Sequence, residues 1–541
     1  MAEFKGHCGG LPIICAMVAA LLPAAAHANQ SFLDAKASKA AYTVAEKKPA
    51  RSCRSFLANT TIAYSIVSAR EIAASKTEPA YCVLQGIITP EVQFWVYLPA
   101  AWNGRFYMPG NGGYAGNTPE ENAGGRGMTD IRRALASGFA VAISNTGHDA
   151  TFEPLGSFGF NNVQKSVDFG YRAVHLTAVT AKDLVSDYYG ERPFKSYWAG
   201  CSMGGRQGMM SAQRFPDDFD GIVADDPVNA FTDLHISLAW FYRALADGPV
   251  QFDKVTRLLA PRVLARCDEL DGLKDGLVSA PDSCRFAPAQ KLPVCGAEEA
   301  RDCFTKSEIA TLEKLYGGVV SNGKAYHPGL PVGSEAGWFG WWPKSLGGYG
   351  AFTIEDFANT FLQYFAFRKD DPARNYRSFN FDSDLAKLDP SVKDILDATD
   401  PDLSAFRSRG GKMVLMIPGS GSSAIPTKPM TDYYHQVAER FGPAQTRDFF
   451  RVMTVPGMYH CFGGNGPSQY DAMTAVIDWV EKGVQPDNLI ASQIEGSDPA
   501  RPNNGGAPGK VLRTLPVCTY PEIPRYRGKG DPSLAASFSC Q

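Results

Sequence analysis

The stretch Gly200-Cys201-Ser202-Met203-Gly204 constrains the fold of this chain more than any other feature. It matches the pattern G-x-S-x-G, follows a strand-like segment at 196–199 and precedes a helix-like segment at 204–214. In that context the pattern predicts a sharp strand-to-helix turn, in which the flanking glycines relieve crowding. Such a turn presents the serine Oγ at the carboxyl edge of a sheet, so we predict Ser202 as a nucleophile. An ordinary Gly/Ser turn is the alternative.

Strand-like and helix-like segments alternate around this turn. The strand-like segments are 92–98, 105–108, 139–143, 196–199, 221–224, 412–417 and 449–455. Helix-like segments between them include 164–190 and 204–214. The alternation predicts a mostly parallel sheet with helices on both faces. Together with the nucleophile turn, it predicts an α/β-hydrolase fold.

The alternation breaks between about 229 and 405, where the chain is irregular and rich in aromatic residues. Segments that carry chemistry fall on both sides of this break. We therefore predict one α/β domain, formed by 29–228 and 406–541, with an inserted lid domain at 229–405. Two independent domains are the less favoured arrangement.

The N-terminus indicates export. Lys5 is followed by an apolar stretch at 11–22 and by Ala26-His27-Ala28, so we predict a signal peptide at 1–28. No later stretch is apolar enough to cross a membrane, and we expect a secreted or periplasmic protein. The 53 Lys and Arg against 56 Asp and Glu give a net charge of −3, which argues against a nucleic-acid partner. The sequence indicates no particular oligomeric state.

Cysteines are the second strong signal. Removal of Cys8 and Cys15 with the signal peptide leaves ten of the 12 cysteines, and an even number in an exported chain predicts disulfides. The sequence does not fix their connectivity. Pairing of close neighbours suggests Cys53–Cys82, Cys267–Cys284, Cys295–Cys303 and Cys518–Cys540, which leaves Cys201 and Cys461. Zinc is a weak alternative, because no C-x-x-C pair occurs.

A general base is expected late in this chain order. His460 lies in the segment 455–461, just after a strand-like segment, and we predict it as the base. His148 at a strand end suggests a structural role, and His435 in a helix-like segment suggests a surface residue. Cys201 directly precedes Ser202 and Cys461 directly follows His460, so a bond between them would tie the two catalytic loops together. A loop of this length gives about 5 kcal/mol in the chain-entropy model.

Two backbone amides are candidates for an oxyanion hole. The N–H of Met203 lies at the start of the helix that follows the nucleophile. A second donor is expected from the glycine-rich segment 109–114, and we favour the N–H of Gly113. A plain glycine turn is the alternative for that segment.

At this point the chain resembles the tannase and feruloyl esterase family. The resemblance rests on the segments 200–208 and 455–461 and extends over nearly the whole mature chain. It implies the Cys201–Cys461 disulfide beside the catalytic residues, the other four cysteine pairs, the inserted lid and hydrolysis of esters of aromatic acids such as ferulate or gallate.

The resemblance also implies a structural calcium site in the lid, within the segment 267–277. Asp268, Asp271 and Asp275 supply carboxylates, and the backbone carbonyls of Leu273 and Leu277 complete an oxygen shell. A solvated acidic turn is the alternative.

The resemblance fails at the triad acid. Ser422 stands where the family has an aspartate after the strand at 412–417, and a serine cannot stabilise an imidazolium by charge. We predict that the acid has moved to the end of the strand at 221–224, with Asp226 favoured over Asp225. Asp432, inside a helix-like segment, is a weaker candidate. Alternatively, the chain is a catalytically impaired family member that binds an aromatic ester or another ligand.

Aromatic residues are dense at 338–342 and 352–367. They suit a pocket for a flat ring, although packing inside the lid explains most of them. Arg368 and Arg374 are weak candidates for binding a substrate carboxylate, and the sequence does not support a claim of terephthalate-ester hydrolysis.

Overall fold

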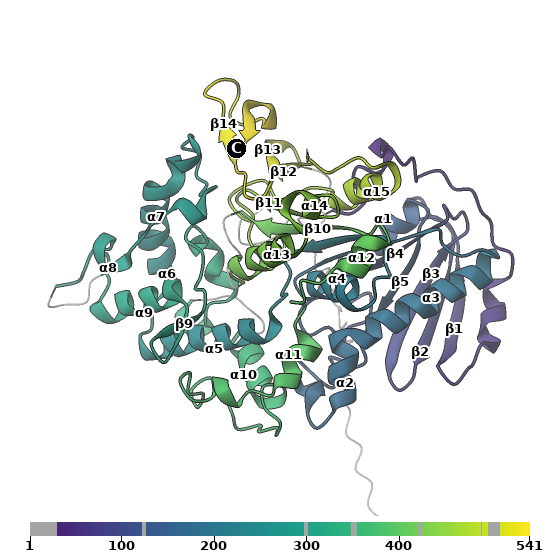
Figure 1. The fold of residues 1–541 in the computed structure, drawn as a ribbon, viewed down its shortest axis with the longest axis horizontal. Helices are drawn as coiled ribbons and strands as arrows, with labels where there is room; N and C mark the ends of the chain where they lie inside the picture. The colour runs from purple at the N-terminus through teal and green to yellow at the C-terminus, as the bar shows by residue number, and fades with distance from the viewer. Residues whose placement is uncertain are drawn as a thin grey trace, which may run out of the picture.

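An eleven-stranded sheet organises the protein, in the order β1-β2-β3-β5-β4-β6-β7-β10-β11-β13-β12 (Figure 1). The strands are β1 Tyr64–Ile72, β2 Tyr81–Ile88, β3 Val92–Pro99, β4 Arg105–Pro109, β5 Ala140–Ser144, β6 Lys195–Cys201, β7 Gly221–Asp225, β10 Lys412–Pro418, β11 Phe450–Val455, β12 Leu489–Ile494 and β13 Val511–Thr519. In this computed structural model the described residues are 30–121, 126–296, 301–347, 354–419, 425–487, 489–495 and 509–541. The predicted signal peptide at 1–28 and Ser422 lie outside them.

The middle of the sheet is parallel and its edges are antiparallel. Strands β5, β4, β6, β7, β10 and β11 run parallel to their neighbours in that order. Strands β1, β2 and β3 add one antiparallel edge, and β13 and β12 add the other. All seven strand-like segments expected from the sequence are strands of this sheet. Parallel strands bring their carboxyl ends to one edge, which is where α/β proteins place their sites.

Alternate residues of the central strands supply two cores, one on each face of the sheet. Phe106 and Met108 of β4 pack with helices α3 Ala173–Tyr189 and α4 Met203–Arg214. Tyr107, between them, packs with α1 Arg126–Ala136 and α15 Ala472–Lys482 on the opposite face. The period of two along a strand therefore explains why buried helices cover both faces, and the predicted α/β-hydrolase fold is confirmed.

The inserted segment, residues 229–405, adds no strand to the main sheet among the described residues. Its longer helices are α5 Phe231–Asp247, α7 Ala260–Cys267, α9 Lys306–Gly317, α10 Ile354–Tyr364 and α11 Pro390–Leu396, and its only described sheet is the hairpin of β8 Val319–Ser321 and β9 Lys324–His327. Figure 1 shows them in teal and green, to the left of and below the sheet.

We expected this segment to be irregular. That expectation is wrong, because much of the segment is helical. Leu234, Leu238, Phe241 and Leu245 of α5 recur at helical spacing and are buried. The domain bounds at 229 and 405 stay predictions. In the described part of the chain, no helix combines the length and apolar character that a membrane crossing requires.

All five expected disulfides are present: Cys53–Cys82, Cys201–Cys461, Cys267–Cys284, Cys295–Cys303 and Cys518–Cys540. Four of them close short local loops, and Cys201–Cys461 spans 260 residues.

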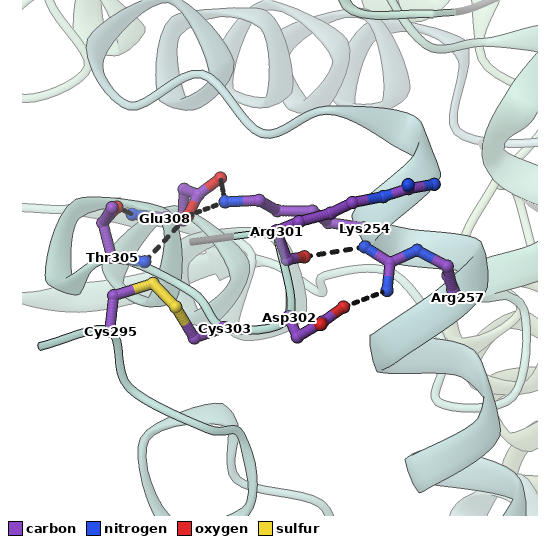
Figure 2. The surroundings of a disulfide bond; sticks show 8 residues. All are labelled: Lys254, Arg257, Cys295, Arg301, Asp302, Cys303, Thr305 and Glu308. Atoms are coloured by element: carbon purple, nitrogen blue, oxygen red, sulfur yellow. Dashed lines mark hydrogen bonds and ion pairs between the residues drawn. A yellow bond between two sulfur atoms is a disulfide. The ribbon is translucent and has the colours of Figure 1, made fainter. Parts of the chain in front are cut away.

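One of these local loops shows how a disulfide is supported (Figure 2). Beside Cys295–Cys303, the Lys254 Nζ lies 2.9 Å from both carboxylate oxygens of Glu308, and Arg257 pairs with Asp302 at 2.7 Å. The disulfide thus closes the loop, and the pair of Arg257 with Asp302 ties the loop to the neighbouring helical segment.

A buried ion pair connects the sheet to a covering helix. The Arg105 guanidinium on β4 donates to both oxygens of Glu481 on α15, at 2.7 and 2.6 Å. Tyr197 on β6 donates its hydroxyl to the same carboxylate at 2.6 Å. The Arg105 and Glu481 side chains are only 10% and 8% exposed. Each charge is therefore stabilised mainly by the other and little by water.

We expect Glu481→Ala to lower the free energy of unfolding by about 3–5 kcal/mol, because it leaves the Arg105 charge buried without its partner. Urea denaturation followed by circular dichroism measures the change. The matched control is Asp432→Ala, which breaks the exposed pair with Lys428 and should cost less than about 1 kcal/mol. Equal losses in the two variants would contradict a structural role for the buried pair.

Candidate active site

Ser202 occupies the predicted strand-to-helix turn between β6 and α4. Its backbone has φ 60° and ψ −119°, a conformation that residues with a side chain rarely adopt. The turn is held because the Ser202 N–H donates to the carbonyl of Asp225 at 3.0 Å. A Cβ at Gly200 would lie 2.6 Å from the carbonyl carbon of Gly204, so this close approach requires glycine. The predicted local structure of the nucleophile is confirmed.

His460 follows β11, and its Nδ1 hydrogen-bonds with the Asp226 Oδ2. Asp226 follows β7, is fully buried and has φ 38°. Its N–H donates to the carbonyl of Met416 on the neighbouring strand at 2.8 Å. The fold therefore orients this carboxylate toward the imidazole from the end of β7.

Asp225 faces away from His460. Its Oδ2 accepts from the Tyr470 hydroxyl at 2.8 Å, and burial raises the pKa of the Asp225 carboxyl well above its usual range. Asp432 lies on α13 Lys428–Phe441, where it pairs with Lys428. Of the three candidate acids, the structure brings only Asp226 to the imidazole Nδ1.

The Cys201–Cys461 disulfide brings the two catalytic loops together, with the Cα atoms 5.9 Å apart. The Sγ of Cys461 lies 3.6 Å from the Nε2 of His460. Since Cys201 is the neighbour of Ser202, the imidazole turns its Nε2 side toward the nucleophile turn and its Nδ1 side toward Asp226. A histidine whose Nδ1 meets a buried carboxylate matches the His-Asp half of a Ser-His-Asp arrangement.

The two elements that carry the expected oxyanion donors are in close backbone contact. Met203 begins α4, and Gly113 lies in the loop that follows β4. A Cβ at Gly110, in the same loop, would lie 2.5 Å from the Gly204 Cα, so the loop rests directly on the first turn of α4. Gly113 has φ 56°, which glycine adopts without cost.

Aromatic residues of the inserted segment lie beside this turn. A Cβ at Gly113 would lie 3.5 Å from the ring of Phe357 on α10, and Phe357 stacks on Tyr114 at a centroid distance of 5.1 Å. Trp341 meets the His460 ring edge-on at 5.9 Å. Trp338 and Trp342, by contrast, are buried and stack on each other inside the inserted segment. Of these aromatic side chains, Phe357 and Trp341 thus lie beside the candidate site, whereas Trp338 and Trp342 belong to the core of the inserted segment.

The two arginines considered for a substrate carboxylate have other surroundings. Arg374 stacks over the Phe367 ring at 3.8 Å and lies 3.7 Å from an Asp371 oxygen. Arg368 is exposed. The structure gives no support for either as a substrate ligand.

The three aspartates expected to bind calcium lie in one loop. Asp268 accepts from the N–H of Asp275 at 3.0 Å, and Asp271 accepts from the N–H of Leu273 at 3.1 Å. Burial raises the pKa of the Asp271 carboxyl and raises that of Asp275 to about 6, although Arg513 pairs with Asp275 at 2.9 Å. Within the described residues no three His, Cys, Asp or Glu side chains converge as metal ligands. The three carboxylates share one loop, and the ion stays a prediction.

Sequence reasoning missed two residues of the nucleophile helix, Arg206 and Gln207. The Arg206 guanidinium is fully buried and donates to the carbonyls of Phe169 at 3.1 Å, Gly170 at 3.1 Å and Leu396 at 2.7 Å. Burial lowers its pKa to about 10. These bonds tie α4 to the helices around it. Only their position in the sequence could have indicated a role, because both residues come just after the Gly204-Gly205 pair.

Comparisons with known proteins agree with this geometry. The family model described as "Tannase and feruloyl esterase" matches residues 82–541. Mono(2-hydroxyethyl) terephthalate hydrolase of Piscinibacter sakaiensis is 33% identical over 533 residues, covering 86% of each chain. Feruloyl esterase B of Aspergillus niger is 30% identical, covering 82% of each chain. The crystal structure of feruloyl esterase B from Aspergillus oryzae matches with a TM-score of 0.76 at 26% identity, over 90% of this chain and 99% of that one.

The sheet, the nucleophile turn and these structural matches define an α/β hydrolase. The chain belongs to the tannase and feruloyl esterase family and is, by family, a carboxylic ester hydrolase.

A buried histidine on α5 makes the stability of this region depend on pH. His235 packs against Tyr114 and Phe361, and its Nδ1 lies 2.8 Å from the carbonyl of Phe231. Burial lowers its pKa from 6.5 to about 4. Between these pH values the unfolded chain binds a proton that the folded chain does not, so this residue makes stability fall as the pH falls.

We expect His235→Gln to lose less stability than the wild type when the pH falls from 6.5 to 4, by on the order of 3 kcal/mol. Chemical denaturation at a series of pH values measures the difference. The control is His435→Gln, at an exposed histidine on α13, which should follow the wild-type curve. A parallel curve for His235→Gln would show that His235 does not remain neutral.

Proposed function

We propose that this protein is a secreted hydrolase that cleaves esters of aromatic acids through a serine acyl-enzyme. Ser202 is the nucleophile, His460 the general base and Asp226 the acid that orients it. The contact between His460 Nδ1 and the buried Asp226 carboxylate carries the proposal. That contact supplies the charge that Ser422 cannot supply from the position where the family resemblance implies an aspartate.

The reaction follows from the arrangement of these groups. The Ser202 Oγ attacks the ester carbonyl carbon while the His460 Nε2 takes its proton, and the carbonyl oxygen becomes an oxyanion held by the N–H groups of Met203 and Gly113. Collapse breaks the bond to the alcohol oxygen, which leaves with the proton from His460. Water then attacks the acyl-enzyme with the same base, releasing the acid and restoring Ser202. Asp226 stabilises the imidazolium formed in both halves.

The relocated acid is physically reasonable because β7 and β10 are adjacent parallel strands. Their carboxyl ends lie side by side, so a carboxylate after either strand reaches the same imidazole nitrogen. The alternative is an impaired family member that only binds its ligand, and it rests on Ser422 alone. The hydrogen bond between the His460 Nδ1 and the Asp226 carboxylate favours a working enzyme over that alternative.

The substrate class and the location rest on separate observations. Phe357 and Trp341 provide flat apolar surfaces beside the predicted oxyanion donor Gly113 and the predicted base, which suits an aromatic acyl or alcohol group. Relatives of this chain are named as feruloyl esterases and as a mono(2-hydroxyethyl) terephthalate hydrolase. Five disulfides and the N-terminal pattern support export to an oxidising compartment.

Calcium is proposed as a structural ion in the loop of Asp268, Asp271 and Asp275, with the carbonyls of Leu273 and Leu277 as further ligands. Asp268 and Asp271 are 5% and 4% exposed. Burial, and to a smaller extent the charges of Asp271 and Asp268, raise the pKa of the nearby Asp275 carboxyl, while Arg513 lowers it. A cation with oxygen ligands would relieve this repulsion. The ion supplies stability to the inserted segment and takes no part in the ester chemistry.

The first test is labelling with a fluorophosphonate probe and peptide mass spectrometry, which needs no knowledge of the substrate. We expect modification of Ser202 in the wild type and none in His460→Ala. In Asp226→Asn, which keeps the shape of the side chain, labelling and turnover of 4-nitrophenyl acetate should fall by about 10³- to 10⁴-fold.

The matched control is Asp432→Asn, which changes an aspartate of α13 away from the imidazole and should label like the wild type. No labelling of the folded wild type would reject the serine mechanism and favour the ligand-binding alternative. Full activity in Asp226→Asn would reject the relocated acid and direct attention to Ser422→Asp.

The calcium proposal predicts that EGTA lowers the melting temperature of the wild type by roughly 3 °C and that added calcium restores it. Asp271→Asn should be insensitive to both treatments. Asp302→Asn, at the exposed partner of Arg257 in the same segment, is the control and should respond like the wild type. Differential scanning fluorimetry gives the values, and an unresponsive wild type would refute the site.

A further inference from the structure

We propose that Gln207 is a positioning residue that sets the distance between the two halves of the oxyanion hole. The proposal rests on the proposed function and adds to it a residue that touches neither substrate nor the reacting atoms. Gln207 lies on α4, the helix that begins with Met203, and only 1% of it is exposed.

The side chain of Gln207 forms a two-point bond with Asn111, in the loop that carries Gly113. Its Oε1 accepts from the Asn111 N–H at 3.0 Å, and its Nε2 donates to the Asn111 Oδ1 at 3.3 Å. The Asn111 Nδ2 donates in turn to the carbonyl of Ser144, at the end of β5, at 2.9 Å. Asn111 is therefore held from the nucleophile helix on one side and from a neighbouring strand on the other.

This bond also decides which amides of the loop are available. The N–H groups of Gly110, Asn111, Ala115 and Gly116 donate to Ala199 O, Gln207 Oε1, Gly112 O and Asn145 O, respectively. In the segment 110–116, which the structure describes in full, the N–H groups of Gly112, Gly113 and Tyr114 make no hydrogen bond with another described residue. Gln207 thus occupies the Asn111 N–H and leaves the next amides, Gly113 included, for an oxyanion.

A close backbone contact also holds the loop against α4. Gly110 touches the first turn of α4 so closely that a Cβ there would lie 2.5 Å from the Gly204 Cα. That contact prevents the loop from approaching the helix any further, but it does not prevent the loop from sliding or tilting. The paired hydrogen bonds of Gln207 fix that movement, because two bonds to one residue define an orientation as well as a distance.

A purely structural amide on the same helix provides the comparison. Gln213, two turns further along α4, donates its Nε2 to the Tyr433 hydroxyl at 3.0 Å and is half-buried. Gln207→Met and Gln213→Met remove equivalent groups from one helix and keep similar volume and helix propensity. Only the first variant changes a contact with the loop of Gly113.

In Gln207→Met we expect kcat for 4-nitrophenyl acetate to fall by about 100-fold with KM changed by less than about 3-fold, because an oxyanion donor acts mainly in the transition state. Affinity for an aryl trifluoromethyl ketone, which forms an oxyanion on Ser202, should fall in parallel. Gln213→Met should keep kcat within about 2-fold of the wild type, since its loss is one of stability alone.

If Gln207→Met does not fold, Asn111→Ala tests the contact from the loop side, because it keeps the N–H and removes the side-chain bonds to Gln207 and to Ser144. We expect about a 10-fold loss of kcat there, again at nearly constant KM. Equal kcat in Gln207→Met and Gln213→Met, or a loss that appears in KM and melting temperature only, would overturn the proposal while the wild type stays active. An inactive, unlabelled wild type would instead reject the proposed function itself.

Discussion

The covalent bond between Cys201 and Cys461 is the constraint on which the site depends. It joins two loops that are 260 residues apart and adjoin the nucleophile and the base directly. A noncovalent contact between loops this far apart would have to offset a large closure entropy, whereas the disulfide removes much of that entropy from the unfolded chain. The inserted segment can therefore be long without loosening the catalytic pair. The strained backbone of Ser202 persists for the same reason, since the surrounding structure over-determines it.

The groups proposed to serve the reaction come from the ends of adjacent strands. Strands β4, β6, β7, β10 and β11 are neighbours in the sheet. The loop of Gly113 follows β4, Ser202 follows β6, Asp226 follows β7 and His460 follows β11. Charges buried beneath this edge have specific partners: Asp226 meets His460, Asp225 meets Tyr470, and Arg206 is shared among three carbonyls. Each group lies in a low-dielectric environment where an unpartnered charge would be costly.

Much of this arrangement could be predicted from the sequence. The nucleophile turn, the late histidine and the cysteine pairs are local signals, and Asp226 followed from knowing that neighbouring strand ends meet. The edge strands were harder, because β1 mixes Arg70 and Glu71 with apolar residues and its faces are half-exposed. The helical nature of α5 was hidden by aromatic residues, which favour neither state strongly. Gln207 carried only the weak signal of its position after the Gly204-Gly205 pair, since a glutamine in a helix is ordinary until its partner in a distant loop is known.

Where the acid sits has a consequence for how such a chain can diversify. With Asp226 as the proposed acid, Ser202 and the acid belong to one short stretch of chain that precedes the inserted segment, and only His460 comes from beyond it. The sequence that follows β10 then carries no group of the proposed reaction. That sequence is free to vary between related chains without loss of the proposed chemistry, as long as the carboxylate after β7 is kept.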